Sequence, residues 1–167
     1  MKATKRYSKS TQKKAIDTAK DSYLPKGSQK GEAICKGCSA VYQNKRWRMA
    51  DVSEKKIKRL SVLCPACKKI KDDFPGGYVT LKGDFLKEHK EEILNLVKNK
   101  EERARSLNPL ERVMAIKSRK GEIEITTTTD KFAQRLGRIL NKAFSGTVEY
   151  KWSGDTKVAR VIWTRQS

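Results

Sequence analysis

Cys35-Lys36-Gly37-Cys38 and Cys64-Pro65-Ala66-Cys67 are two short motifs that contain all four cysteines of the chain. The gap of two residues within each motif lets both thiolates face one ion, and two such motifs complete a tetrahedral site of four sulfur ligands. Four sulfurs leave no open coordination position, which is typical of a structural zinc site and not of a catalytic one. The motifs therefore predict a zinc ribbon over residues 31–74, with Zn²⁺ bound by Cys35, Cys38, Cys64 and Cys67.

Other uses of the cysteines fit the sequence less well. Disulfides form in oxidising compartments, and no apolar signal segment opens the chain, so we expect a reducing, cytoplasmic location. A redox Cys-x-x-Cys motif normally occurs singly near a βαβ pattern, whereas this chain has two motifs. The 25 residues between Cys38 and Cys64 exceed the usual ribbon spacing. We expect a hairpin of strands 40–42 and 46–48 and a short helix over 51–60, capped by Asp51 or Ser53, to occupy this interval.

The remainder of the chain predicts an α+β fold. A turn of helix follows Cys67 through Lys71, and a connecting segment, 75–109, carries a linking strand and a long amphipathic helix from Gly83 to about Arg105. Residues 110–167 have a β-β-α-β-β pattern, whose helix is capped by Thr129 or Asp130 and ends at Ser145-Gly146. The predicted strands cover 112–118, 122–127, 148–152 and 159–163. This pattern predicts a four-stranded antiparallel sheet with one helix on one face.

The charge of the chain points to a polyanionic partner. Lys and Arg number 39 against 19 Asp and Glu, which gives a net charge of +20. Residues 1–30 hold nine basic and two acidic residues, and we expect them to form a flexible basic tail. Residues 75–109 are nearly neutral, so the tail, the ribbon and the carboxyl-terminal part are the expected contact surfaces. The apolar runs are too short to span a membrane.

Two groups of basic residues are the candidate nucleic-acid contacts. The final predicted helix carries a row at i, i+4, i+7 and i+11, opposite its apolar stripe, which suits a phosphate backbone; a solvated helix face is the alternative. The ribbon carries basic residues around an aromatic side chain, on which unpaired bases can stack. Trp47 can instead form the small core of the ribbon. The helix group is Lys131, Arg135, Arg138 and Lys142, and the ribbon group is Arg46, Trp47, Arg48, Lys58 and Arg59.

Catalytic constellations are not evident in the sequence. There is no glycine-rich phosphate loop, no histidine paired with a nucleophile and no cluster of carboxylates with metal spacing. Asp72-Asp73 can bind magnesium, but a surface pair at a helix end is more common. We expect the only histidine, His89, to be partly buried, and Tyr150, Trp152 and Trp163 to pack against the final helix. We therefore expect no enzymatic activity and no small-molecule substrate.

Several stretches resemble a family of small bacterial zinc-ribbon proteins. They are residues 63–85 (LCPACKKIKDDFPGGYVTLKGDF), 99–103 (NKEER), 108–112 (NPLER), 124–137 (EITTTTDKFAQRLG) and 146–152 (GTVEYKW). They are similar in turn to the amino-terminal zinc region of the archaeal and eukaryotic adaptor that binds the large ribosomal subunit before export. The likeness covers about residues 32–165 and implies a ribosome- or RNA-associated role, without carrying a contact residue onto this chain.

These observations favour a zinc-stabilised, non-catalytic RNA-binding protein, monomeric when free and acting on ribosomes or structured RNA in assembly or stress. A zinc-ribbon DNA-binding transcriptional regulator is the first alternative, because a basic helix can enter a major groove. An RNA-processing enzyme is the second, and the missing catalytic residues disfavour it.

Overall fold

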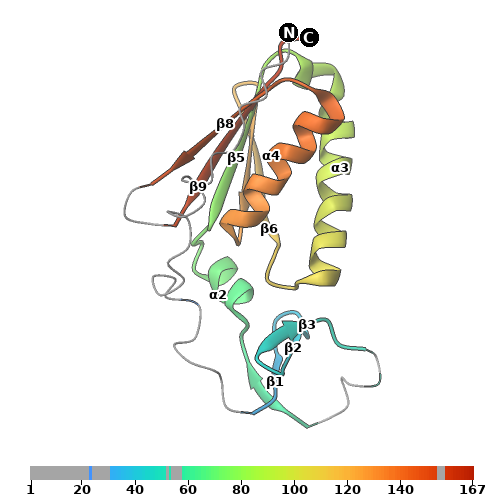
Figure 1. Cartoon of the computed structure of the whole chain (residues 1–167), viewed down its shortest axis with the longest axis vertical. Helices are drawn as coiled ribbons and strands as arrows, with labels where there is room; N and C mark the ends of the chain where they lie inside the picture. The colour runs from blue at the N-terminus through green and yellow to red at the C-terminus, as the bar shows by residue number, and fades with distance from the viewer. Residues whose placement is uncertain (1–22, 24–30, 52, 54–57, 154–156) are drawn as a thin grey trace.

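The structure is a computed structural model that describes residues 23, 31–51, 53, 58–153 and 157–167. The predicted basic tail, apart from Tyr23, and most of the predicted helix over 51–60 lie outside the described residues. Two sheets, one at each end of the short helix α2 (Pro65–Lys71), make up the described part of the fold (Figure 1). No helix in this part is both long and apolar enough to cross a membrane.

The smaller sheet has four strands in the order β3-β2-β1-β4. The predicted hairpin is present as β2 (Val41–Gln43) and β3 (Arg46–Arg48), and its turn has positive φ at Asn44 and Lys45, as a two-residue hairpin turn requires. Two strands were not predicted. β1 (Ala33–Cys35) pairs antiparallel with β2 and parallel with β4 (Leu60–Val62), so Leu60 belongs to a strand and not to the predicted helix.

The larger sheet has five strands in the order β6-β7-β5-β9-β8. The predicted hairpins are β6 (Val113–Arg119) with β7 (Glu122–Thr127) and β8 (Thr147–Trp152) with β9 (Ala159–Thr164). The prediction of four antiparallel strands was wrong, because β5 (Gly77–Lys82) enters between the hairpins, antiparallel to β7 and parallel to β9. A hairpin pattern in the sequence predicts only the pairing of its own two strands. The free edges of β7 and β9 are instead paired by β5, which lies far from both in the sequence.

One face of the larger sheet carries α3 (Phe85–Leu107) and α4 (Asp130–Phe144), which lie side by side against it (Figure 1). Val79 and Leu81 of β5 and Trp163 of β9 are fully buried beneath them. A Cβ atom at Gly137 of α4 would lie only 2.6 Å from Cγ1 of Val161, so glycine permits this close helix–sheet contact. Phe132, Leu136 and Leu140 of the predicted apolar stripe of α4 are buried in the core, whereas Ala143, at the end of that stripe, is exposed.

The beginning of α4 is defined by its cap. Thr129 has an extended backbone, and its hydroxyl accepts a hydrogen bond of 3.2 Å from the Phe132 amide, so Thr129 and not Asp130 is the N-cap. The predicted aromatic packing is also present. Tyr150 and Trp152 pack at the edge of the core, and the buried Trp163 donates from Nε1 to the Ser145 carbonyl at 2.8 Å.

Candidate metal centre

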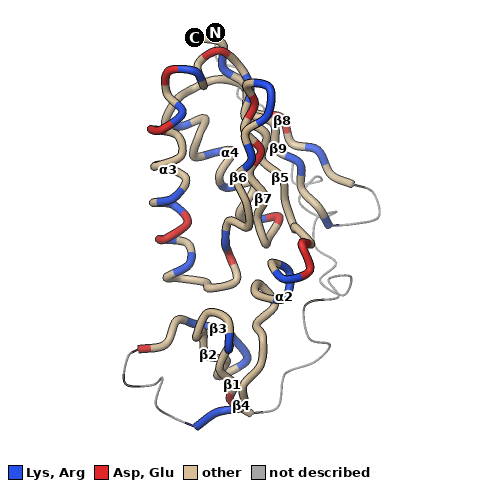
Figure 2. Tube along the Cα trace, turned by 180° about the vertical axis from the view of Figure 1, so that it is seen from behind, with Lys and Arg blue, Asp and Glu red and all other residues tan. Residues whose placement is uncertain are grey.

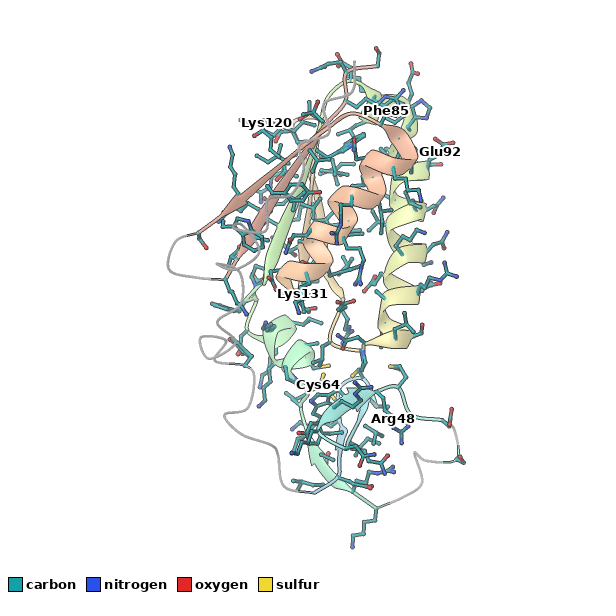
Figure 3. All side chains as sticks on the ribbon, in the orientation of Figure 1. Arg48, Cys64, Phe85, Glu92, Lys120 and Lys131 are labelled. Carbon is teal, nitrogen blue, oxygen red and sulfur yellow. The ribbon has the colours of Figure 1, made fainter. Side chains whose placement is uncertain are left out.

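The four cysteine sulfurs converge between the smaller sheet and α2 (Figure 3). All four Sγ atoms lie within 4.8 Å of one another, and Cys38 Sγ is 3.7 Å from Cys64 Sγ. A tetrahedral ion with Zn–S bonds of about 2.3 Å places its sulfurs about 3.8 Å apart. The cluster can therefore hold a metal ion with only small adjustments, and its closed set of sulfur ligands is the one that the sequence predicts.

Each cysteine is positioned by its local backbone. Cys35 ends β1, and its sulfur accepts hydrogen bonds from the amides of Gly37 at 3.4 Å and Cys64 at 3.2 Å. Cys64 is the N-cap of α2, where its sulfur accepts the Cys67 amide at 3.4 Å, and Pro65 occupies the first helical turn. These N–H groups stabilise thiolate sulfurs and so favour the metal-binding form of the site.

Gly37 is required by the space that Cys67 occupies. A Cβ atom at position 37 would lie 2.9 Å from Cys67 Sγ and 3.3 Å from Cys67 Cβ. Contacts of this length force the neighbouring atom to move. The glycine of the first motif thus makes room for a ligand of the second motif.

Arg112 is a contributor that sequence reasoning missed. It lies just before β6, yet its Nη1 donates to Cys67 Sγ at 3.3 Å, across 45 residues of sequence. Four thiolates around a divalent cation keep two negative charges in excess, and a guanidinium offsets part of that charge. No local pattern marks Arg112, because its partner is brought close only by the tertiary fold.

The pKa values of Cys38, Cys64 and Cys67 are shifted in different directions. A hydrogen bond donated by the Cys64 thiol stabilises the Cys38 thiolate and lowers the pKa of Cys38 to about 5. Because Cys64 keeps its proton in this hydrogen bond, the pKa of Cys64 is raised. Burial raises the pKa of the Cys67 thiol to about 11. Metal binding requires thiolates, so it releases the protons that these sulfurs retain.

A small apolar cluster surrounds the sulfurs. Trp47 is only 9% exposed, its ring centroid lies 5.4 Å from that of Tyr42, and Ala33 and Ala66 complete the cluster. Trp47 therefore has the core position that the sequence left as the alternative to base stacking. Leu110, from the segment before β6, packs on the same cluster.

Polar contacts join the metal centre to the larger sheet. Lys69 of α2 is 7% exposed, and its Nζ donates to the Thr128 carbonyl at 3.2 Å. The Thr128 hydroxyl donates to the Leu110 carbonyl at 2.5 Å and accepts from the Arg112 amide at 2.9 Å. Since Thr129 caps α4, one connected set of contacts runs from the second cysteine motif to the start of that helix.

The predicted basic row on α4 is only partly free. Lys131, Arg138 and Lys142 are exposed, and no ion pair involves them among the described residues; Lys131 lies at the end of α4 nearest the metal centre (Figure 3). Arg135 differs, because it pairs with the buried carboxylate of Glu111 and lies over the Phe132 ring. It serves the packing of α4 against the preceding segment.

The predicted contacts on the ribbon also divide. Arg46 and Lys58 are exposed. Arg48 donates to Gln43 at 2.7 Å, and the Arg59 side chain is 4% exposed and pairs with Glu32 at 3.0 Å. Hydrogen bonds from Arg59 and Gln43 lower the pKa of Glu32. The exposed basic residues therefore form two separate groups, one on the ribbon and one on α4 (Figure 2).

The residues outside these groups have structural partners. His89 is partly buried, as predicted; its ring stacks on Phe85 at 4.0 Å, and its Nδ1 lies 2.8 Å from a Glu92 carboxylate oxygen. Asp72 accepts a hydrogen bond of 2.9 Å from the Tyr23 hydroxyl. In the described part of the chain, the only group of three or more potential metal ligands is the cysteine cluster.

Comparisons of the chain with protein-family models, with curated proteins and with solved structures found no match.

Proposed function

We propose that the protein is a zinc-stabilised, non-catalytic RNA-binding protein that associates with ribosomes during assembly or stress. The net charge of +20 on a folded chain is the observation that carries this proposal. An imbalance of this size favours a polyanionic partner, because close cationic side chains repel one another until counter-charges approach. The resemblance in residues 63–85 and 124–137 supports RNA, and ribosomal RNA in particular, as the polyanion.

Zinc is the metal that the donor set favours. Four thiolates are soft ligands, and a closed set of four sulfurs matches structural zinc sites. The apolar cluster around the sulfurs is small, so the free energy of metal binding supplies much of the stability of this region. In this proposal the ion stabilises the ribbon and takes no part in a reaction.

Exposed cations on α4 provide the first RNA contact surface. Arg138 and Lys142 lie on its solvent side without an ion pair in the described part of the chain, so each can approach a phosphate and release counterions. On the ribbon, Arg46 and Lys58 can do the same. Lys and Arg are interspersed with Glu along α3, so this helix offers no comparable surface (Figure 2).

Charge reversal on α4 tests the proposal. The double variant Arg138→Glu/Lys142→Glu should bind ribosomal RNA more weakly, and its log–log salt slope should fall by roughly 0.7 to 0.9 for each phosphate that the variant no longer neutralises. The control variant Lys90→Glu/Lys98→Glu, on the exposed side of α3, changes the net charge equally. It should retain the wild-type affinity for ribosomal RNA and the wild-type salt slope. Fluorescence anisotropy at several salt concentrations and co-sedimentation with ribosomal fractions provide the measurements.

Three outcomes decide between the candidate functions. Equal reductions in both double variants would mean that α4 is not a specific contact surface. Tighter, sequence-selective binding to duplex DNA would favour the transcriptional regulator. Purified protein that carries no metal as isolated, and that does not bind RNA even at low salt, would contradict the proposal as a whole.

A further inference from the structure

The larger sheet has a second face, which α3 and α4 do not cover. Side chains alternate along each strand, so Tyr78, Thr80 and Lys82 of β5 point away from the helices, between the buried Val79 and Leu81. No helix or strand among the described residues covers this surface, which we call the open face. An uncovered face is ordinarily a solvated one, and its composition decides whether it is more than that.

The strand register arranges the open face in three cross-strand rows. Each row runs from β6 through β7, β5 and β9 to β8. The rows are Ala115, Thr126, Tyr78, Arg160 and Lys151; then Lys117, Glu124, Thr80, Ile162 and Glu149; then Arg119, Glu122, Lys82, Thr164 and Thr147.

An aromatic–guanidinium pair lies in the first of these rows. Arg160 Cζ, on β9, is 4.5 Å from the centroid of the Tyr78 ring on the central strand β5. Tyr78 is half-buried and Arg160 is exposed. A planar base can extend such a stack, since bases stack both on aromatic rings and on guanidinium planes.

The charges of the open face are mixed. Lys82 pairs with Glu122 at 3.0 Å, and Lys151 approaches Glu149 at 3.7 Å. Lys117 and Arg119 have no ion pair among the described residues, and they border a hollow with Thr80, Glu122 and Glu124. The face therefore offers free cations for phosphates and carboxylates close beside them.

We propose that the open face binds single-stranded RNA, with a base stacked on the Tyr78–Arg160 pair and phosphates held by Lys117 and Arg119. This inference rests on the proposed function and names the form of RNA and the surface that reads it. A face of this width accommodates about two or three bases.

Carboxylates on the open face favour an unpaired strand over a duplex. A duplex presents mainly phosphates to a flat surface, and Glu124 and Glu149 repel them. An unpaired strand turns its bases toward the surface, where carboxylates accept hydrogen bonds from the amino groups of the bases. The same acidic residues that weaken backbone binding thus support base recognition.

The test compares full-length variants on two RNA probes of equal length, a mixed-sequence single strand and a perfect duplex. Tyr78→Leu removes the ring and keeps apolar bulk, whereas Tyr78→Phe keeps the ring. Arg160→Gln is matched by Arg103→Gln, which removes an exposed guanidinium from α3. Anisotropy gives the affinities, thermal unfolding verifies that each variant is folded, and photocrosslinking to 4-thiouridine RNA locates the contact.

We expect Tyr78→Leu and Arg160→Gln to weaken single-strand binding by about 5- to 100-fold and to leave duplex binding nearly unchanged. Tyr78→Phe and Arg103→Gln should bind as the wild type does, and crosslinks should fall in residues 77–82. If the folded variants bind the single strand unchanged, or bind both probes equally weakly, the open face is not a single-strand site. The inference would also be overturned if the wild type were a dimer and Tyr78→Leu were the one variant that is monomeric, because the open face would then be a dimer interface. Absence of wild-type binding to either probe contradicts the proposed function itself.

Discussion

Arg112 shows how one side chain can link a metal centre to a distant sheet. Its guanidinium contacts Cys67 Sγ, while its backbone amide bonds to Thr128. Its Nε atom is buried and has no hydrogen-bond partner among the residues that the structure describes, so the side chain is held by the sulfur contact and by packing. A partner of this kind orients a ligand and offsets its charge without binding the metal.

Replacing Arg112 should therefore weaken metal binding. We expect Arg112→Gln to reduce zinc affinity by about 10- to 100-fold, the usual effect of removing a group that supports a metal ligand. Competition with a chromophoric chelator measures this, and Arg103→Gln on the exposed side of α3 is the control. Equal affinities in the two variants would show that the Arg112–Cys67 contact is dispensable.

Gly37→Ala addresses the close approach of the two cysteine motifs. The added methyl group would meet Cys67 Sγ at 2.9 Å and displace it from the cluster. We expect weaker zinc binding and a lower unfolding temperature of the ribbon, whereas Lys36→Ala, at an exposed neighbour, should have neither effect. Metal content after dialysis and thermal unfolding are the two measurements.

The helix α4 is the element whose sequence and structure agree most closely. Its apolar residues recur at helical spacing, and burial on one stripe follows directly from that period. The cap could not be assigned from sequence, because Thr129 and Asp130 are both good N-cap residues. Only the backbone angles and the bond to the Phe132 amide distinguish them.

Capping variants can verify this assignment. Thr129→Ala should lower the free energy of unfolding by about 1 kcal/mol, since the Phe132 amide loses its partner, and Thr129→Ser should restore most of it. Asp130→Ala should cost less, because it removes only a charge near the helix dipole. Urea denaturation gives the three values, and a larger decrease for Asp130→Ala would contradict the assignment.

The strands were predictable as local hairpins and not as a sheet. Each hairpin follows from alternation and a turn, which are properties of neighbouring residues. The place of β5 depends on pairing with β7 and β9, which lie far away along the chain. The same limit applies to the site: spacing predicts the four sulfurs, whereas the Arg112 contact and the pairing of Arg135 with Glu111 depend on tertiary packing.

At the scale of the whole molecule, the described residues form two cores of different origin that are joined through α2. The larger core is built from buried aliphatic and aromatic residues of the five-stranded sheet and its helices. The smaller one consists of the cysteines and a few apolar neighbours. We expect the larger core to be stable on its own and the smaller one to depend on a bound metal ion.

Metal removal should separate the two cores. In the presence of a strong chelator, or in Cys38→Ser, amide hydrogen exchange should accelerate in β1–β4 and at the start of α2, while β5, β7 and β9 remain protected. The exchange pattern of the zinc-loaded protein is the reference. Retained protection of the ribbon in the chelated protein would mean that metal contributes little to its stability.

The parallel pairing of β5 with β9 also determines the order in which the molecule can mature during translation. The cysteine motifs precede the strands of the larger sheet in the chain, so they leave the ribosome before those strands and can capture metal while the sheet is still being made. The edge of β5 that pairs with β9, however, has no partner strand until residues 159–164 emerge. Until then the nascent chain exposes an unsatisfied central strand, so a chaperone or rapid completion of synthesis must protect it from pairing with another chain.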